Sequence, residues 1–213
     1  MRRKEFLWIL LAFLVGMLLF WRLGTIEALS YQEEIAEEII RLHVIADSDK
    51  GCDQRLKLQV KEAVVTELRK KLSEAKNIEE ARSIICENLE GIETISNTVI
   101  RENGFSYKAK ASLGQAVFPI KRYGDLTFPA GEYEALRIQL GKAEGKNWWC
   151  VMFPTLCFVD EAKQEITEEN KEKFKEILTE EEYESISKNS GNQVFFKLKF
   201  GEYLNKVIDY FPI

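Results

Sequence analysis

The chain begins with a single uninterrupted apolar segment. A basic cluster at residues 2–4 precedes an apolar run from Phe6 to Trp21. A basic flank before an apolar helix is typical of an export signal, and it holds the N-terminus in the cytoplasm. At about 1.5 Å per residue the run reaches about 24 Å, slightly less than the roughly 30 Å hydrocarbon core, and Leu23 extends it. We predict a hydrophobic export or anchor helix that contacts the membrane through residues 6–23.

The pattern leaves open whether residues 1–28 are removed as a signal peptide or kept as a membrane anchor. Ala28 is small enough to precede a cleavage site, whereas Ile26 is larger than such sites prefer and Glu27 is unfavourable. Both alternatives place residues 29–213 outside the cytoplasm. We expect these residues to form one domain, because about 185 residues can build a core and no Pro-, Gly- or Ser-rich linker divides them.

Apolar residues recur with helical spacing in the first half of this domain. Residues 30–40 predict a short acidic helix that leads into a β-branched strand at residues 41–46. A long helix with Asp53 as its N-cap follows, and Asn77 with Glu80 resembles the capping box of a second long helix. The apolar stripes consist of Leu56, Val60, Ala63, Val64, Leu68 and Leu72 in the first helix and Ile78, Ala81, Ile85, Leu89, Ile92 and Val99 in the second.

Beyond Gly104 the apolar period changes to two. Apolar and polar residues alternate from Phe105 to Leu113, which predicts a half-exposed strand. Further strands are predicted at residues 133–140, 148–153, 156–159 and 194–200, and helices at residues 168–186 and 202–210. Two long helices thus precede a cluster of strands. This order predicts an α+β fold with a mainly antiparallel sheet.

The predicted domain is acidic. Four of the 30 Lys and Arg residues and two of the 35 Asp and Glu residues fall within residues 1–28, which leaves 26 basic against 33 acidic side chains. Nucleic acids and anionic lipid surfaces are bound by clustered Lys and Arg. The composition therefore argues against a nucleic-acid partner.

Candidate catalytic chemistry depends on His43, because it is the only histidine. A histidine in a strand is usually a structural residue with a satisfied hydrogen bond. A Cys/His hydrolase that pairs His43 with Cys150 or Cys157 stays open, since such partners meet in space and not in sequence. Residues 47–49 (Asp-Ser-Asp) are more typical of a turn and cap than of a cation site. We expect no metal and no cofactor.

The spacing of two cysteines favours a disulfide. Cys150 and Cys157 would face each other across a hairpin if Phe153 and Pro154 form a two-residue turn. The alternative is a pair of buried thiols in the core. Cys52 and Cys86 are expected to be free.

Trp148 and Trp149 are adjacent in a predicted strand, so they point to opposite faces of the sheet. One of them reaches the surface unless both faces of the sheet are covered. An exposed Trp is a candidate contact for a partner. Burial of both side chains under helices is the alternative.

Two blocks of the sequence resemble the stage II sporulation protein R family. The first block is Arg41–Asp49 (RLHVIADSD), followed by Asp53-Gln54 and Leu56-Lys57. The second block runs from Phe128-Pro129-Ala130-Gly131 through Ala135–Ile138 (ALRI) to Asn147–Cys157 (NWWCVMFPTLC). The chain departs from the family pattern at Asp47, Ala143 and Thr155, where Asn, Gly and Pro are usual.

The resemblance implies a signalling protein of endospore formation. Such proteins are made in the forespore and exported across the forespore membrane into the intermembrane space. There they activate a membrane-embedded aspartic protease, similar to stage II sporulation protein GA, which cleaves the pro-segment from the precursor of sigma factor E. A ligand of this kind is not itself an enzyme and needs no cofactor.

Five residues of the two blocks are candidate contacts for that protease: Trp148, Trp149, Arg137, Asp47 and Asp49. The competing interpretations are the extracytoplasmic Cys/His hydrolase and a passive cell-envelope binding module.

Overall fold

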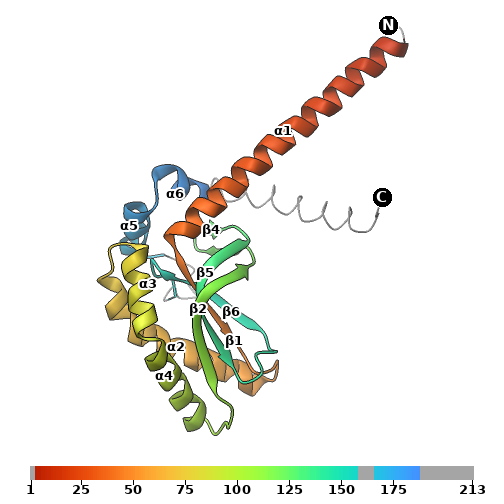
Figure 1. The fold of residues 1–213 in the computed structure, drawn as a ribbon. Coiled ribbons are helices and arrows are strands. Elements are labelled where there is room, and N and C mark those ends of the chain that lie inside the picture. The colour runs from red at the N-terminus through yellow and green to blue at the C-terminus, as the bar shows by residue number, and fades with distance from the viewer. Residues whose placement is uncertain (1–2, 158–165, 188–213) are drawn as a thin grey trace.

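The computed structural model describes residues 3–157 and 166–187. Its first element is a single helix, α1 (Arg3–Glu38), whose N-terminal part extends away from the rest of the molecule (Figure 1). The prediction of a separate acidic helix at residues 30–40 is wrong, because the Glu- and Ala-rich sequence there has high helix propensity and continues the first helix. Its C-terminal end packs into the molecule through Ile35 and Ile39.

The apolar side chains that the structure describes between Trp8 and Phe20 of α1 are exposed. Trp8 is 70% exposed and Phe20 is 78% exposed. Across residues 3–157 and 166–187, no helix combines the length and the apolar character that crossing a membrane requires. The membrane anchor predicted over residues 6–23 is not confirmed.

Four strands form the central sheet, in the order β2-β5-β1-β6. They are β1 (Ile40–Ile45), β2 (Ala109–Phe118), β5 (Gly131–Leu140) and β6 (Asn147–Phe153). β1 pairs parallel with β5 and antiparallel with β6, and β2 pairs antiparallel with β5. The predicted α+β class with a mainly antiparallel sheet is confirmed.

Three helices cover one face of this sheet (Figure 1). They are α2 (Gly51–Ser73), α3 (Ile78–Glu87) and α4 (Leu89–Glu102). Asn77 caps α3 by accepting from the Glu80 N–H, as predicted. The second long helix is instead two helices, because Asn88 interrupts it and its side-chain amide bonds to the Ile84 carbonyl. Asp53 is not an N-cap: it lies within the first turn of α2, and Lys50 occupies the cap position.

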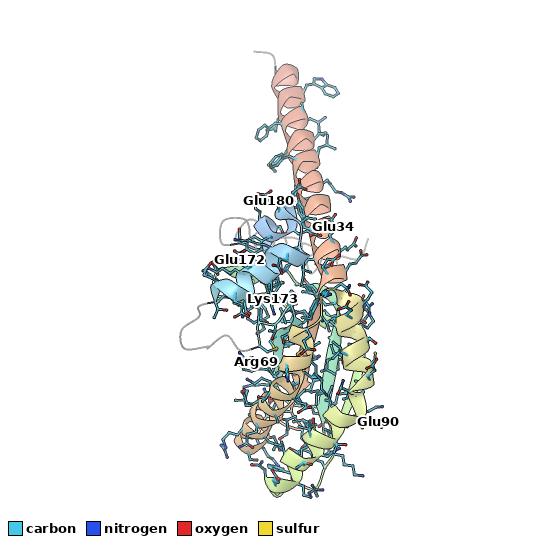
Figure 2. All side chains as sticks on the ribbon, turned by 90° about the vertical axis from the view of Figure 1, so that its left-hand side faces the viewer. Glu34, Arg69, Glu90, Glu172, Lys173 and Glu180 are labelled. Carbon is cyan, nitrogen blue, oxygen red and sulfur yellow. A yellow bond between two sulfur atoms is a disulfide. The ribbon has the colours of Figure 1, made fainter. Side chains whose placement is uncertain are left out.

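A second layer covers part of the other face. It comprises the hairpin of β3 (Lys121–Tyr123) and β4 (Leu126–Phe128), two short helices, and the end of α1. The helices are α5 (Glu168–Ile177) and α6 (Glu180–Ile186). A single helix over residues 168–186 was predicted, but Thr179 forms a capping box and starts a new helix. Figure 2 shows Glu34, Glu172 and Glu180 projecting from α1, α5 and α6 near the same end of the molecule.

The remaining strand predictions have mixed outcomes. The strand expected at residues 105–113 begins at Ala109 and continues to Phe118. Residues 156–157 form no strand. The strand and helix predicted at residues 194–200 and 202–210 lie outside the described residues.

Candidate partner-binding site

Asp47 and Asp49 hold the turn between β5 and β6 in place. The Asp47 carboxylate accepts a hydrogen bond from the Lys142 N–H at 2.8 Å, and the Asp47 carbonyl accepts from the Glu144 N–H at 3.2 Å. The Asp49 carboxylate accepts from the Lys146 N–H at 2.7 Å. Each of the two carboxylates therefore bonds to backbone of its own chain. A role for them in contacting a partner stays a prediction.

Two glycines allow this close approach of the two segments. Gly141 has a φ of +55°, and a Cβ there would collide with the Asp47 carboxylate. A Cβ on Gly145 would collide with the Ser48 backbone. Ala143, where the family pattern has Gly, also has a φ of 55°, in the left-handed region that disfavours a side chain. The turn is thus fixed by its contacts with the segment that follows β1.

A buried polar network lies beneath the same turn. The Asp53 carboxylate, only 4% exposed, accepts from Ser48 Oγ at 2.5 Å and from the Tyr107 hydroxyl at 2.8 Å. Lys57 Nζ donates to the Lys146 carbonyl at 3.0 Å. Burial raises the pKa of Tyr107, and its bond to Asp53 adds to this, whereas burial lowers the pKa of Lys57. Residues of the first sequence block thus bind α2 and the β5–β6 turn to β1.

His43 lies in the centre of the sheet, between Arg137 on β5 and Trp149 on β6. His43 Nε2 is 2.8 Å from Asn147 Oδ1, and the imidazole stacks on Trp149 with ring centroids 5.9 Å apart. Burial lowers the pKa of His43; the Asn147 bond opposes this effect, and the positive charge of Arg137 adds to it. With its Nε2 proton donated to Asn147, the neutral imidazole is the favoured form.

The Cys/His hydrolase interpretation requires a free thiol at Cys150 or Cys157 close to His43, and neither cysteine supplies one. Cys150 and Cys157 are joined in a disulfide, with Cα atoms 5.3 Å apart, so the predicted bond is confirmed. Cys150 pairs with Leu42 in the sheet, so its side chain lies on the opposite face from that of His43. Cys52 and Cys86 are free and exposed, as expected. Within residues 3–157 and 166–187, no group of three or more potential ligands could hold a metal ion.

The turn that permits the disulfide differs from the predicted hairpin. Phe153 still belongs to β6, and the turn is made by Pro154 and Thr155. The Leu156 N–H then donates to the Val151 carbonyl at 2.9 Å. The chain reverses here without starting a second strand in the described residues.

Trp148 and Trp149 point to opposite faces, as predicted, and both are half-buried. Trp148 packs against the core under α2–α4, with Lys61 Nζ 5.0 Å from its ring centroid. Trp149 packs against the smaller cluster on the other face, with Lys121 Nζ 4.6 Å from its ring centroid. Neither alternative stated from the sequence describes the pair fully, because each ring is covered on one side and each keeps an accessible part.

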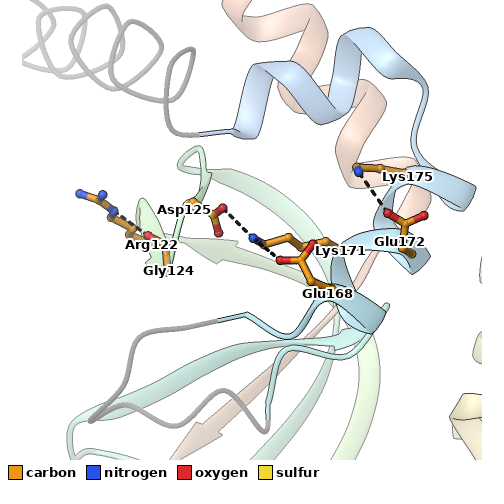
Figure 3. Close-up of polar contacts among 7 residues, drawn as sticks. All are labelled: Arg122, Gly124, Asp125, Glu168, Lys171, Glu172 and Lys175. Atoms are coloured by element: carbon orange, nitrogen blue, oxygen red, sulfur yellow. Dashed lines mark hydrogen bonds and ion pairs between the residues drawn. The ribbon is translucent and has the colours of Figure 1, made fainter.

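A pocket of about 440 Å³ opens beside β6. Its wall combines the β3–β4 hairpin, β6 and the disulfide, with Lys121, Arg122, Tyr123, Gly124, Asn147, Trp148, Trp149, Cys150, Leu156 and Cys157 as lining residues. The Tyr123 hydroxyl donates to the Trp149 carbonyl at 3.1 Å and so joins the hairpin to the sheet. Figure 3 shows Arg122 bonded to the Gly124 carbonyl and pointing away from α5, whose Lys171 pairs with Asp125 at 3.1 Å.

Behind this pocket lies a fully buried arginine. The Arg41 guanidinium is 4.2 Å from the Phe118 ring centroid and 4.8 Å from that of Tyr133. Arg41 Nη2 makes a long hydrogen bond of 3.4 Å to the Tyr123 hydroxyl, and Nε and Nη1 have no partner among the described residues. Cation–π attraction partly offsets the cost of burying this charge. Through Tyr123, Arg41 supports the hairpin that forms one wall of the pocket.

Two of the candidate contacts, Arg137 and Trp149, lie on the same face of the sheet, with His43 of β1 between them. The structure separates them from Asp47 and Asp49, which bond within the β5–β6 turn. Sequence reasoning missed Lys121 and Arg122, because a three-residue strand is too short to show a period. The one local signal was the turn pair Gly124-Asp125 between two short runs.

Comparison with known protein families and with curated proteins points to the same family in both cases. The family model for Stage II sporulation protein R matches residues 36–163. The chain is 39% identical over 139 residues to Stage II sporulation protein R of Bacillus subtilis (strain 168). That alignment covers 65% of this chain and 62% of the relative. No solved structure matches the chain.

Proposed function

Because this chain belongs to the stage II sporulation protein R family, we propose that it is an exported signalling protein of endospore formation. In this role it activates a membrane-embedded aspartic protease of the stage II sporulation protein GA kind, which then processes the precursor of sigma factor E. The observation that carries the proposal is the family match over residues 36–163. The alignment spans 62% of the Bacillus subtilis relative, so the activity of the whole protein is part of the proposal.

Export into the intermembrane space is the proposed location. The basic and apolar leader of residues 1–28 supports it, as do the exposed apolar side chains of α1 such as Trp8 and Phe20. The Cys150–Cys157 disulfide supports it further, since disulfides persist outside the reducing cytoplasm.

Activation by a ligand needs a difference in affinity and no catalytic group. If the chain binds the active state of the protease better than the inactive one by about 1.4 kcal/mol, the equilibrium moves tenfold. The half-buried Trp149, the pocket and its cations offer a surface for such binding. The hydrolase alternative has no free thiol beside His43 to support it.

The proposal is tested in a non-sporulating host that makes the protease and the sigma precursor. Adding this chain is expected to start precursor cleavage, as followed by immunoblot. Deleting residues 1–28 should abolish the effect, and a foreign signal peptide in their place should restore it. The size of the exported product then separates cleavage near Ala28 from retention as an anchor. Equal cleavage with and without the chain would refute the assignment and favour the passive envelope-binding module.

A further inference from the structure

We propose that the pocket beside β6 binds an acidic, extended segment of the protease, with Trp149, Lys121 and Arg122 as the principal contacts. This inference rests on the proposed function and assigns a surface to it. Three properties of the described residues carry it: cations without an acidic partner, hydrogen-bond donors without an acceptor, and the size and position of the pocket.

The pocket gathers cations that lack an acidic partner. Lys121 and Arg122 line it, and Arg137 lies on the adjoining sheet face. None of the three forms an ion pair with an acidic side chain in the described part of the chain, although the domain as a whole is acidic. A local cluster of uncompensated positive charge favours a partner of opposite charge.

The unpaired nitrogens near the pocket are donors. Among the described residues, Nε1 of Trp149, which lines the pocket, is buried without a hydrogen-bond partner, and so is Nε of Arg137 on the same face of the sheet. A buried donor without an acceptor is unfavourable, because it has lost its hydrogen bond to water. Carboxylate oxygens accept hydrogen bonds and neutralise cations at once, so an acidic side chain would satisfy both kinds of group.

The position of the pocket favours a peptide. β6 is an edge strand, and no strand among residues 3–157 and 166–187 pairs with its outer side. Part of this edge is already used within the chain, because the Trp149 carbonyl accepts from the Tyr123 hydroxyl and the Val151 carbonyl accepts from the Leu156 N–H. A segment of the partner would therefore lie along the hairpin and β6 and bind chiefly through side chains that enter the pocket. The volume of about 440 Å³ is within the usual range of roughly 300–1,000 Å³ for ligand pockets.

Charge reversal of two residues tests the surface. The variant Lys121→Glu/Arg122→Glu changes the pocket, and Lys70→Glu/Lys76→Glu makes the same charge change at exposed positions at and just after the end of α2. Each full-length variant is made in the host with a tagged protease, and the amount that co-purifies from detergent is measured. We expect the pocket variant to bind at least about tenfold more weakly and the control variant to bind as the unchanged chain does. Equal binding by both variants would overturn the inference. The pair Lys121→Gln/Arg122→Gln repeats the test if charge reversal prevents folding.

A second measurement separates this inference from the proposed function. The indole N–H signals of Trp148 and Trp149 are followed by NMR in the full chain in neutral micelles. A glutamate-rich decapeptide should shift the Trp149 signal at low salt, and a lysine-rich decapeptide should not.

A Trp149 shift caused by anionic phospholipid and not by the glutamate peptide would identify a lipid surface instead. Self-association that the pocket variant abolishes would identify a second copy of the chain as the occupant. If the protease neither binds nor responds to the unchanged chain, the proposed function fails, and the peptide titration still decides the chemistry of the pocket.

Discussion

The turn between β5 and β6 and the pocket beside β6 differ in how their polar groups are used. At the turn, the carboxylates of Asp47, Asp49 and Asp53 all bond within the chain. At the pocket, the Trp149 indole N–H has no partner among the described residues, and Lys121 Nζ lies 4.6 Å from the Trp149 ring centroid. Both regions are built largely from the two blocks that resemble the family.

The difference indicates that the two sequence blocks contain both residues that stabilise the fold and residues that are available to a partner. Residues whose bonding is complete inside the chain fix the geometry of β1, β5 and β6. Residues whose bonding is incomplete are the ones that gain free energy from a partner. The comparison predicts that removing a bonded carboxylate at the turn reduces stability, whereas changing the pocket reduces signalling.

The largest expected effect is on stability, from Asp53→Ala. The substitution leaves the half-buried Tyr107 hydroxyl and Ser48 Oγ without the buried carboxylate that accepts from both. We expect the free energy of unfolding to fall by about 3 kcal/mol. Asp53→Asn keeps one acceptor oxygen and should cost about half as much. Chemical denaturation of the exported domain measures both, and an unchanged midpoint for Asp53→Ala would contradict the role of this network.

The adjacent tryptophans give the sharpest comparison. Trp148→Ala removes a ring that packs under α2–α4, so it should cost about 2 kcal/mol of stability. Trp149→Ala should cost less stability and reduce precursor cleavage at least about tenfold, because this ring lies at the proposed contact. Thermal melts and cleavage rates are measured for both variants at the same protein level. The reverse ranking of the cleavage rates would place the contact on the helical side.

A smaller effect concerns pH. Because burial lowers the pKa of His43 in the folded chain, the unfolded chain binds more protons as pH falls below the ordinary value of about 6.5. Stability should therefore be fully present above about pH 6.5 and decrease as pH falls from there toward the folded pKa. His43→Gln should show less of this decrease. Denaturation of both proteins across this range measures the difference, and identical pH profiles would contradict it.

The smallest expected effect is a gain in stability from Ala143→Gly. Ala143 holds a left-handed conformation that costs about 1–2 kcal/mol for a residue with a side chain. Glycine loses about 0.5–1 kcal/mol through its greater freedom in the unfolded chain. The net result should be a stabilisation of about 0.5 kcal/mol with no change in cleavage rate. A decrease in the denaturation midpoint would show that the Ala143 methyl group makes a favourable contact.

Much of the fold follows from local patterns. The strand at residues 41–46, the cap at Asn77 and the opposite orientations of Trp148 and Trp149 follow from composition and period, and the structure has all three. The Cys150–Cys157 disulfide follows from spacing, although the turn between the cysteines lies one residue later than predicted, at Pro154 and Thr155.

Other features depend on tertiary contacts that no local pattern shows. Asn88 divides a continuous apolar stripe into two helices through a single side-chain bond. Arg41 is buried because aromatic rings from distant strands surround it, which its strand pattern does not reveal. The cations at Lys121 and Arg122 meet Trp149 only because the β3–β4 hairpin folds against β6.

Site-specific photo-crosslinking tests the central claim most directly, namely that the chain is a ligand that contacts the protease through its pocket face. A photoreactive residue replaces Arg122 at the pocket in one variant and Glu90, which lies on α4 (Figure 2), in another. In the host that makes the protease, the account predicts a covalent adduct with the protease from position 122 and none from position 90. An adduct from position 90 alone would indicate that the protease contacts the face of the molecule that α2–α4 cover. The absence of any adduct from either position, under conditions where cleavage occurs, would contradict direct binding.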